Sequence, residues 1–258
     1  MPRFKIVIWY PTSYDEEDWG KLALKTKLAQ LEAAAAVAKT QIATVASAQG
    51  LFLGPEYLLS AGYEDNRPVP LSAHERTQAG GKLAKMSRSL GSTIFIPGSM
   101  LITNKDGKVE SHAVAYYNAE ARFSCTKKDP VGETADDARL FVKGNGGGAA
   151  TIAGVGYGLQ ICRDASRDGY LTTKVDVHIA VSAGLALSNL VNPGGTAPRL
   201  RIVAERGGAR SDRAGGGVEI KAESGGQFAV SAPTDLADTG DVEAPFNVMK
   251  TWDVQYTP

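Results

Sequence analysis

Apolar residues in the first hundred positions follow two spacings, one typical of buried strands and one typical of helices. Residues 4–10 form a β-branched and aromatic run that stops at Pro11, which predicts a buried strand. Between residues 25 and 48, apolar side chains recur at steps of three and four and so share one helical face, with Gly50 expected as the C-cap residue. A second strand, a second helix and a third strand are expected over residues 51–53, 74–90 and 93–102.

Short strands and glycine clusters dominate the rest of the chain. The Asp-Gly pair at 106–107 predicts a tight turn, because glycine adopts the positive φ that such turns need. A β–α–β–α–β opening followed by strands indicates an α/β fold with helices outside a mixed sheet. No linker divides the sequence, so we expect one domain over 1–258. Later strands are expected over 113–117, 121–127, 159–161, 175–181, 218–220 and 228–230, with a short helix over 164–174.

Composition narrows the classes of partner. Hydrophobic residues make up 43% of the chain and charged residues 22%, and 28 basic side chains balance 28 acidic ones, so we expect no basic face for nucleic acid or an anionic membrane. No apolar stretch reaches the roughly 18 residues that span a bilayer. Two cysteines cannot build a disulfide framework, and no helix follows the glycine-rich loop 144–149 to bind phosphate. We therefore expect a reduced, cytoplasmic protein without a metal or a cofactor.

Cys162 lies where the expected strand 159–161 meets the polar pair Arg163-Asp164 and the expected short helix. At a strand-to-helix turn, the helix N-terminus gives a cysteine thiolate character and the sheet edge exposes its sulfur. A buried cysteine that acts as a small hydrophobic side chain is the other interpretation. Strand alternation places Cys125 on the core side, where we expect it to be inert.

Two charged residues also follow apolar strands. Glu56 comes after residues 51–53 and a Gly-Pro pair, where partial burial would raise the pKa of its carboxyl group and suit it to proton transfer. A solvated loop residue, or a structural partner of an arginine, is the alternative. Alternation from Ala121 puts Lys127 on the core side and Lys128 on the outer side. An inward lysine at a strand end can stabilise an oxyanion, whereas two lysines in a row otherwise mark a solvated strand end.

Three short motifs follow one another at steps of 71 and 35 residues. They are Leu-Phe-Leu-Gly-Pro-Glu ending at Glu56, Thr-Lys-Lys around Lys127, and Gly-Leu-Gln-Ile-Cys-Arg-Asp around Cys162. This order resembles the nitrilase (carbon–nitrogen hydrolase) superfamily, whose marks are an apolar strand into Pro-Glu, a strand ending in Lys and a strand into Cys-x-Asp. The resemblance runs from residue 4 to about residue 184 and fades over the atypical region 190–258. It implies a four-layer αββα sandwich of nitrilase type.

The resemblance also implies a role for each motif residue. Glu56 would be the general base, first towards the thiol and then towards the hydrolytic water. Cys162 would be the nucleophile that forms a thioester. Lys127 and the backbone N–H of Arg163 would hold the oxyanion, and Glu133 would be a second carboxylate that positions the lysine and the substrate.

The activity implied is hydrolysis of a non-peptide carbon–nitrogen bond, in a small amide or nitrile, by a homodimer or a higher homo-oligomer. An acyl transferase that passes the acyl group to an amine, or a catalytically silent binding or assembly module, would use the same fold. A thiol redox sensor would need Cys162 and Cys125 close together. A Cys162–His178 pair would likewise need a tertiary contact that the sequence does not indicate.

Overall fold

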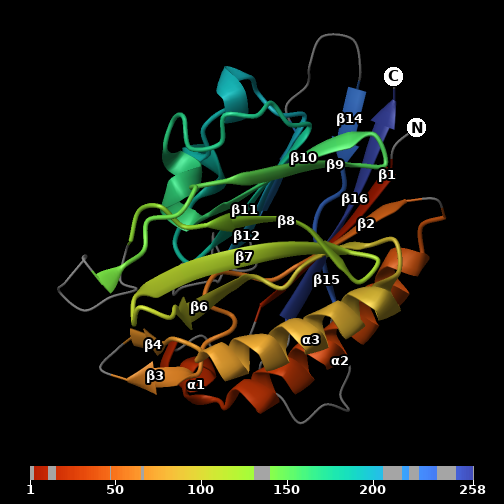
Figure 1. Cartoon of the computed structure of the whole chain (residues 1–258). Helices are drawn as coiled ribbons and strands as arrows, with labels where there is room; N and C mark the ends of the chain where they lie inside the picture. Colours follow the sequence, from red (N-terminus) through yellow and green to blue (C-terminus); the bar gives the residue numbers. More distant parts are fainter. Residues whose placement is uncertain are drawn as a thin grey trace.

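The computed structural model of the 258-residue chain describes residues 3–10, 16–46, 48–64, 67–130, 140–205, 217–220, 227–236 and 248–257. Two β-sheets lie one over the other, and helices cover the outer side of one of them (Figure 1). The N-terminal and C-terminal strands lie side by side, because the first strand pairs with the last over eight residue positions. This pairing gives one sheet strands from both ends of the chain.

The first sheet has nine strands within the described ranges, and its centre is parallel. In spatial order the path is β14 (Gln227–Val230), β16 (Val248–Thr257), β1 (Arg3–Tyr10), β2 (Gln49–Leu53), β5 (Ile94–Ile96), β7 (Val109–Tyr117) and β6 (Ser99–Thr103), with β15 (Thr234–Leu236) beside β16 and β8 (Glu120–Thr126) beside β7. The strand expected over 93–102 is two strands, because the chain turns at Pro97 and Gly98. Gly98 has a φ of 82°, and a Cβ there would collide with the carbonyl oxygen of Pro55.

The second sheet has five strands within the same ranges. Their order is β13 (Gly217–Ile220), β12 (Leu200–Glu205), β11 (Val177–Ser182), β10 (Val155–Ile161) and β9 (Gly148–Ile152). Strands β10, β11 and β12 are parallel, so their carboxyl ends meet at one edge of the sheet. Elsewhere, β3 (Gly62–Glu64) and β4 (Arg67–Val69) form a separate antiparallel pair.

Among the described residues, three helices cover the outer face of the first sheet: α1 (Glu16–Lys21), α2 (Leu24–Ala43) and α3 (Ala73–Leu90). The buried residues of α2 lie on the predicted face, but the helix ends at Ala43 and Gly50 belongs to β2. A Cβ on Gly50 would crowd the side chains of Ile42 and Thr93, so close packing explains this glycine. No helix in the described part of the chain is long and apolar enough to cross a lipid bilayer.

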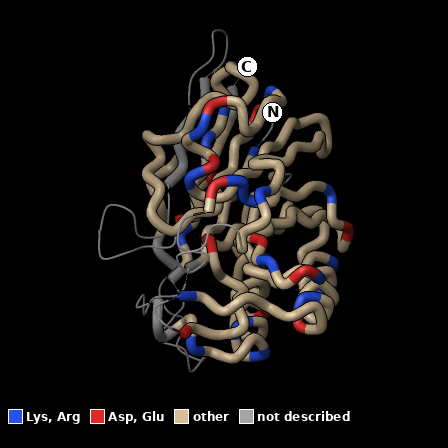
Figure 2. Tube along the Cα trace, turned by 60° about the vertical axis from the view of Figure 1, so that its left-hand side comes forward, with Lys and Arg blue, Asp and Glu red and all other residues tan. Residues whose placement is uncertain are grey.

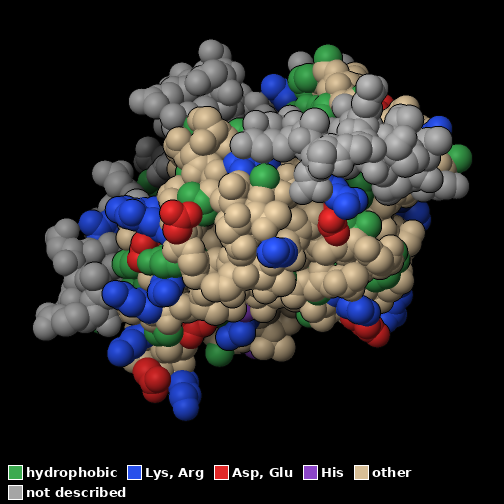
Figure 3. Space-filling view, turned by 90° about the horizontal axis from the view of Figure 1, so that it is seen from above, with side chains coloured by type: hydrophobic (Ala, Val, Ile, Leu, Met, Phe, Trp, Pro, Cys, Tyr) green, Lys and Arg blue, Asp and Glu red, His purple; other side chains and the backbone are tan. Residues whose placement is uncertain are grey.

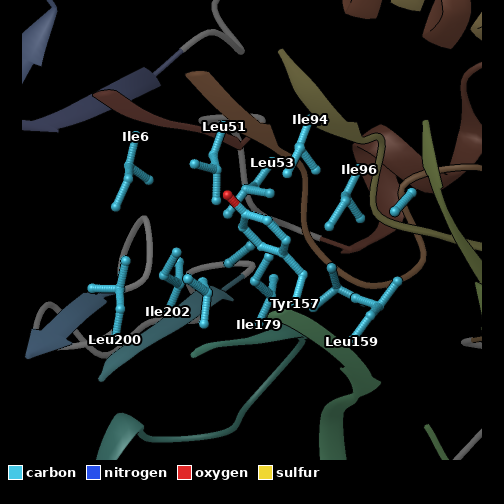
Figure 4. Close-up of a cluster of buried hydrophobic side chains, with 14 of the residues drawn as sticks. Ile6, Leu51, Leu53, Ile94, Ile96, Tyr157, Leu159, Ile179, Leu200 and Ile202 are labelled. Atoms are coloured by element: carbon cyan, nitrogen blue, oxygen red, sulfur yellow. The ribbon is translucent and has the colours of Figure 1, made fainter. Parts of the chain in front are cut away.

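Apolar side chains from the two sheets form the main core between them (Figure 4). The first sheet contributes Ile6, Leu51, Leu53, Ile94 and Ile96, and the second contributes Tyr157, Leu159, Ile179, Leu200 and Ile202. A second apolar layer fills the space between the first sheet and the helices. The α/β class expected from the sequence is confirmed.

The outer face of the second sheet is covered differently. Its described residues form three short 3₁₀ segments and loops, with no α-helix among them: η2 (Cys162–Ser166), η3 (Leu187–Asn189) and η4 (Pro193–Gly195). The helix expected over 164–174 is therefore wrong and is reduced to the single turn of η2. Gly169 adopts a φ of 76°, which interrupts helical geometry, and the β-branched pair Thr172 and Thr173 follows.

Charged residues are dispersed over the described surface. Basic and acidic positions are interspersed along the trace in Figure 2, and on the face seen in Figure 3 the basic side chains stand among acidic and uncharged ones.

Candidate active site

Glu56 and Lys127 form a buried ion pair although 71 residues separate them in the sequence. Lys127 Nζ lies 2.8 Å from Glu56 Oε1, and the two side chains are 0% and 1% exposed. Glu56 follows β2 and Lys127 follows β8, so the ends of two strands of the first sheet bring the charges together. The inward orientation predicted for Lys127 is confirmed. Lys128 is half-buried, with its Nζ 4.2 Å from the centre of the Tyr170 ring.

Backbone hydrogen bonds fix the turn that carries Glu56. The Glu56 N–H donates to the carbonyl of Ser182 on the second sheet, over 3.3 Å. The next residue, Tyr57, has a φ of 55°, and its N–H donates to Ser99 Oγ over 2.9 Å. This left-handed turn directs the phenol of Tyr57 towards the lysine, and Lys127 Nζ donates to Tyr57 Oη over 3.4 Å. Sequence reasoning missed Tyr57, whose only signal was its position beside the Pro-Glu pair.

Cys162 begins the η2 turn directly after β10, with a φ of 46°. A residue other than glycine in this left-handed region is strained, and such strain is concentrated at functional sites. The hydroxyl of Ser182, at the end of the neighbouring strand β11, donates to Cys162 Sγ over 3.7 Å. The cysteine is half-buried and is not in a disulfide.

The charges of the ion pair reach the thiol of Cys162. Burial raises the pKa of this thiol to about 12, and the Glu56 carboxylate adds to the rise. Lys127 and the hydrogen bonds from the Ala183 backbone N–H and the Ser182 hydroxyl act in the opposite direction. The thiolate character expected from a helix N-terminus is therefore wrong for the resting protein, because no α-helix follows Cys162. A base has to accept the proton before the sulfur can attack.

Arg163, Glu133 and Cys125 were also considered in the sequence analysis, and the structure describes two of the three. Arg163 is the second residue of η2 and its side chain is exposed. Glu133 lies outside the described residues. Cys125 is buried in the core between the sheets, and burial raises the pKa of its thiol above the ordinary range. The structure records both cysteines as free.

His178 takes part in a different buried contact. It is fully buried on β11, and its Nε2 lies 2.9 Å from Gln160 Oε1. Burial, followed by the nearby charge of Arg201, lowers the pKa of His178 to about 3, so its ring is neutral at physiological pH. Among the described residues, no group of three or more His, Cys, Asp or Glu side chains is placed to hold a metal ion.

Asp164 is a second residue that sequence reasoning left without a role. Its carboxylate is fully buried and accepts the backbone N–H groups of Lys128 and Asp129 over 2.6 and 3.0 Å. Burial raises the pKa of Asp164 to about 6, while these hydrogen bonds and Lys127 oppose the rise. The only signal in the sequence was its place in the Cys-x-Asp motif.

No protein-family model matches the sequence, and no curated protein does. Solved structures do match. The amidase NitN from Nesterenkonia sp. AN1 is 17% identical, with a TM-score of 0.60 and coverage of 85% of each chain. A variant of this amidase, described as belonging to the nitrilase superfamily, is also 17% identical, with a TM-score of 0.56, and the match covers 79% of this chain and 76% of that one.

A glutamine-dependent NAD+ synthetase from Acinetobacter baumannii is 18% identical, with a TM-score of 0.53 over 71% of this chain. This chain spans about a third of that longer protein, since the match covers 33% of it. At identities this low, the structural matches show the fold of this chain but do not show its substrate or its activity. The two packed sheets, with helices outside the first, have the fold of the nitrilase-superfamily amidases.

Proposed function

We propose that this protein is an amidase-type hydrolase of non-peptide carbon–nitrogen bonds, with Cys162 as nucleophile, Glu56 as general base and Lys127 as oxyanion donor. The observation that carries the proposal is the buried Lys127–Glu56 ion pair, whose two charges both act on the thiol of Cys162. A buried ion pair is a weak source of stability, because its desolvation offsets the Coulomb attraction. Its position beside a strained cysteine is better explained by chemistry.

Acylation begins with transfer of the thiol proton from Cys162 Sγ to the Glu56 carboxylate. The sulfur then forms a bond to the carbonyl carbon of the amide, and the carbonyl π electrons move onto the oxygen. Lys127 and the backbone N–H of Arg163 stabilise this oxyanion, as preorganised donors do in acyl transfer. The carbon–nitrogen bond breaks, the nitrogen leaves with the proton held by Glu56, and a thioester remains on Cys162.

In deacylation, Glu56 acts as base towards water, and the Cys162 sulfur is the leaving group. Glu56 removes a proton from a water molecule, and the oxygen attacks the thioester carbon. The carbon–sulfur bond breaks, the carboxylic acid is released and the proton returns to Cys162. Glu133 is proposed as a second carboxylate that orients Lys127 and the substrate during both halves of the reaction.

Intact-mass measurement after exposure to a panel of small amides tests this proposal. We expect an adduct with the mass of the acyl group on the wild-type protein and no adduct on Cys162→Ala. Lys128→Ala serves as the matched control, because Lys128 neighbours Lys127 and contacts Tyr170 instead of the ion pair. Acid as product supports hydrolysis, whereas an amide formed only with added amine would replace hydrolysis by acyl transfer. No adduct and no product across the panel would favour a silent binding module.

A homo-oligomer in the reducing cytoplasm is also proposed. The surface of α2 beside α3 supports the oligomer, because a groove of about 730 Å³ lies between the two helices. Ala29 and Ala36 on α2 are exposed, and small exposed side chains permit close approach of another surface. The two free cysteines agree with a reducing compartment. Light scattering that gives a 27.2 kDa particle at micromolar concentration would contradict the oligomer.

A further inference from the structure

The carboxylate of Asp164 joins the two segments that carry Lys127 and Cys162. Its Oδ2 accepts the N–H of Lys128 over 2.6 Å, and its Oδ1 accepts the N–H of Asp129 over 3.0 Å. The donors are the two residues after Lys127, and Asp164 itself is two residues after Cys162. One buried side chain therefore connects the end of a strand in the first sheet to the turn that follows a strand in the second.

Further contacts join the same two segments outside this buried bridge. Tyr170 Oη donates to Asp129 Oδ1 over 3.1 Å, and Arg167 Nε lies 3.5 Å from Asp129 Oδ2. The ammonium of Lys128 lies over the Tyr170 ring. These groups are more exposed than Asp164, so Asp164 makes the best-shielded contact of the set.

The backbone of Asp164 is fixed as well. The side-chain amide of the buried Gln160 donates to the carbonyl of Asp164 over 3.0 Å, and the N–H of Arg167 donates to the same carbonyl over 3.1 Å. Gln160 also donates to the carbonyl of Gly146 over 3.0 Å. The Asp164 carboxylate therefore has little freedom to follow the Lys127 segment if that segment moves.

We propose that Asp164 is a positioning residue, which sets the separation between the Lys127 ammonium and the Cys162 sulfur. The inference rests on the proposed function. Lys127 stabilises the thiolate of Cys162 through its charge. Because Coulomb interaction falls with distance, a shift of the residue 127–129 segment away from η2 weakens that stabilisation. Asp164 touches neither the thiol nor the substrate in this scheme and acts through the lysine.

Asp164 could act on the Cys162 thiol as a nearby charge or as the anchor of Lys127. Replacement of Asp164 by asparagine would change the pKa of that thiol in opposite directions under these two explanations. If Asp164 acted only as a nearby negative charge, its removal would favour the thiolate and lower the thiol pKa. If Asp164 holds Lys127 in place, its removal moves the ammonium away and raises the thiol pKa. Asparagine keeps the size of the side chain but presents an amide N–H₂ to one of the two backbone donors.

The experiment measures the rate constant for alkylation of Cys162 by iodoacetamide between pH 7 and pH 9, with peptide masses to identify the site. Below the thiol pKa, this rate follows the thiolate fraction. We expect alkylation of Asp164→Asn to be slower than that of the wild type by about tenfold at each pH, the size of a one-unit rise in pKa. The control is Asp176→Asn, because Asp176 likewise accepts a backbone N–H, that of Gly156 over 2.9 Å, at the opposite end of β10.

An unchanged or faster alkylation rate in folded Asp164→Asn would overturn the inference. If that variant does not fold, Tyr170→Phe removes the hydroxyl that donates to Asp129 and should slow alkylation in the same direction by a smaller factor, and no slowing there would overturn the inference too. The two proposals fail differently. A wild-type Cys162 that is not alkylated defeats the proposed function, whereas a reactive Cys162 that is insensitive to Asp164 defeats the positioning role alone.

Discussion

Lys127 Nζ and Glu56 Oε1 lie 2.8 Å apart at the meeting point of two strand ends, and neither side chain is more than 1% exposed. Loss of either partner removes this ion pair from the other buried charge. Such a change affects both stability and the proposed chemistry, so each variant below requires a stability measurement beside the activity measurement.

Lys127→Ala should remove activity and also destabilise the fold. The loss of an oxyanion donor typically lowers the rate by about 100-fold to 1000-fold, and breaking a buried pair costs about 3–5 kcal/mol. Lys128→Ala should keep most of the activity, because the Lys128 ammonium stacks on Tyr170. Amide turnover and urea unfolding of both variants test this pair of outcomes. A more severe effect from Lys128→Ala would contradict the assigned roles.

Glu56→Gln should stop turnover at the acyl-enzyme or before it. Glutamine keeps the shape of the side chain but cannot accept a proton, so the proposed base can no longer activate water. Any thioester that forms should persist, and intact-mass measurement over time would detect it. Turnover at the wild-type rate would show that another base serves Cys162.

Cys162 should be alkylated before Cys125. Cys162 is half-buried with a thiol pKa of about 12, whereas Cys125 is fully buried and its thiol pKa is raised further. Solvent access and thiolate fraction therefore both favour reaction at Cys162. Peptide mapping after limited exposure to iodoacetamide gives the order, and first labelling of Cys125 would contradict the proposed site.

Ser182→Ala should slow alkylation of Cys162 by about twofold to fivefold, the effect of one lost hydrogen bond. The Ser182 hydroxyl donates to the sulfur and accepts the N–H of Leu185 over 2.9 Å. Glu205 Oε2 accepts the same N–H over 3.0 Å, so the loop keeps an anchor in the variant. Ser89→Ala is a matched control, because the hydroxyl of Ser89 donates to the carbonyl of Met86 in its own helix, over 2.7 Å. Equal rates in the two variants would leave Ser182 without influence on the thiol.

Asp164 should make wild-type stability fall as pH rises from about 4 to about 6. Its folded pKa of about 6 lies above the ordinary 3.8, so in this window the folded state binds the proton and the unfolded state releases it. The contribution of Asp164 to stability is fully present below the pKa of the unfolded state, and it is lost as the pH rises through the pKa of the folded state. Thermal unfolding of wild type and Asp164→Asn over pH 3.5–7 tests this, and the Tm difference between them should change across the window. A constant difference would contradict the raised pKa.

The local pattern of the sequence determined much of the first sheet and its helices. Strand β1, helix α3 and the start of helix α2 were predicted close to their observed bounds, because amphipathic spacing is a property of neighbouring residues, whereas α2 ends earlier than expected, at Ala43. The inward orientation of Lys127 followed from alternation along one strand, which holds wherever one face is buried.

Tertiary structure decided the helix after Cys162 and the bonding of Asp164. The segment 164–174 was expected to form a helix, yet it forms a single 3₁₀ turn, because Gly169 interrupts helical geometry and because Asp164 and Tyr170 bond to the Lys127 segment. Contacts of this kind involve the backbone of a distant segment. Because nearly every residue has a backbone N–H, the sequence does not indicate which of them Asp164 will bind.

The sequence by itself determined which residues are chemically capable: a cysteine after an apolar strand, a carboxylate after another and an inward lysine. Only the tertiary structure decided that Glu56 and Lys127 meet at 2.8 Å and that their charges reach Cys162. The physical reason is that side-chain pattern is set by periods of two and 3.6 residues, whereas ion pairing across 71 residues depends on the order of strands in the first sheet. The approach of Cys162 to that pair depends on how the second sheet packs on the first.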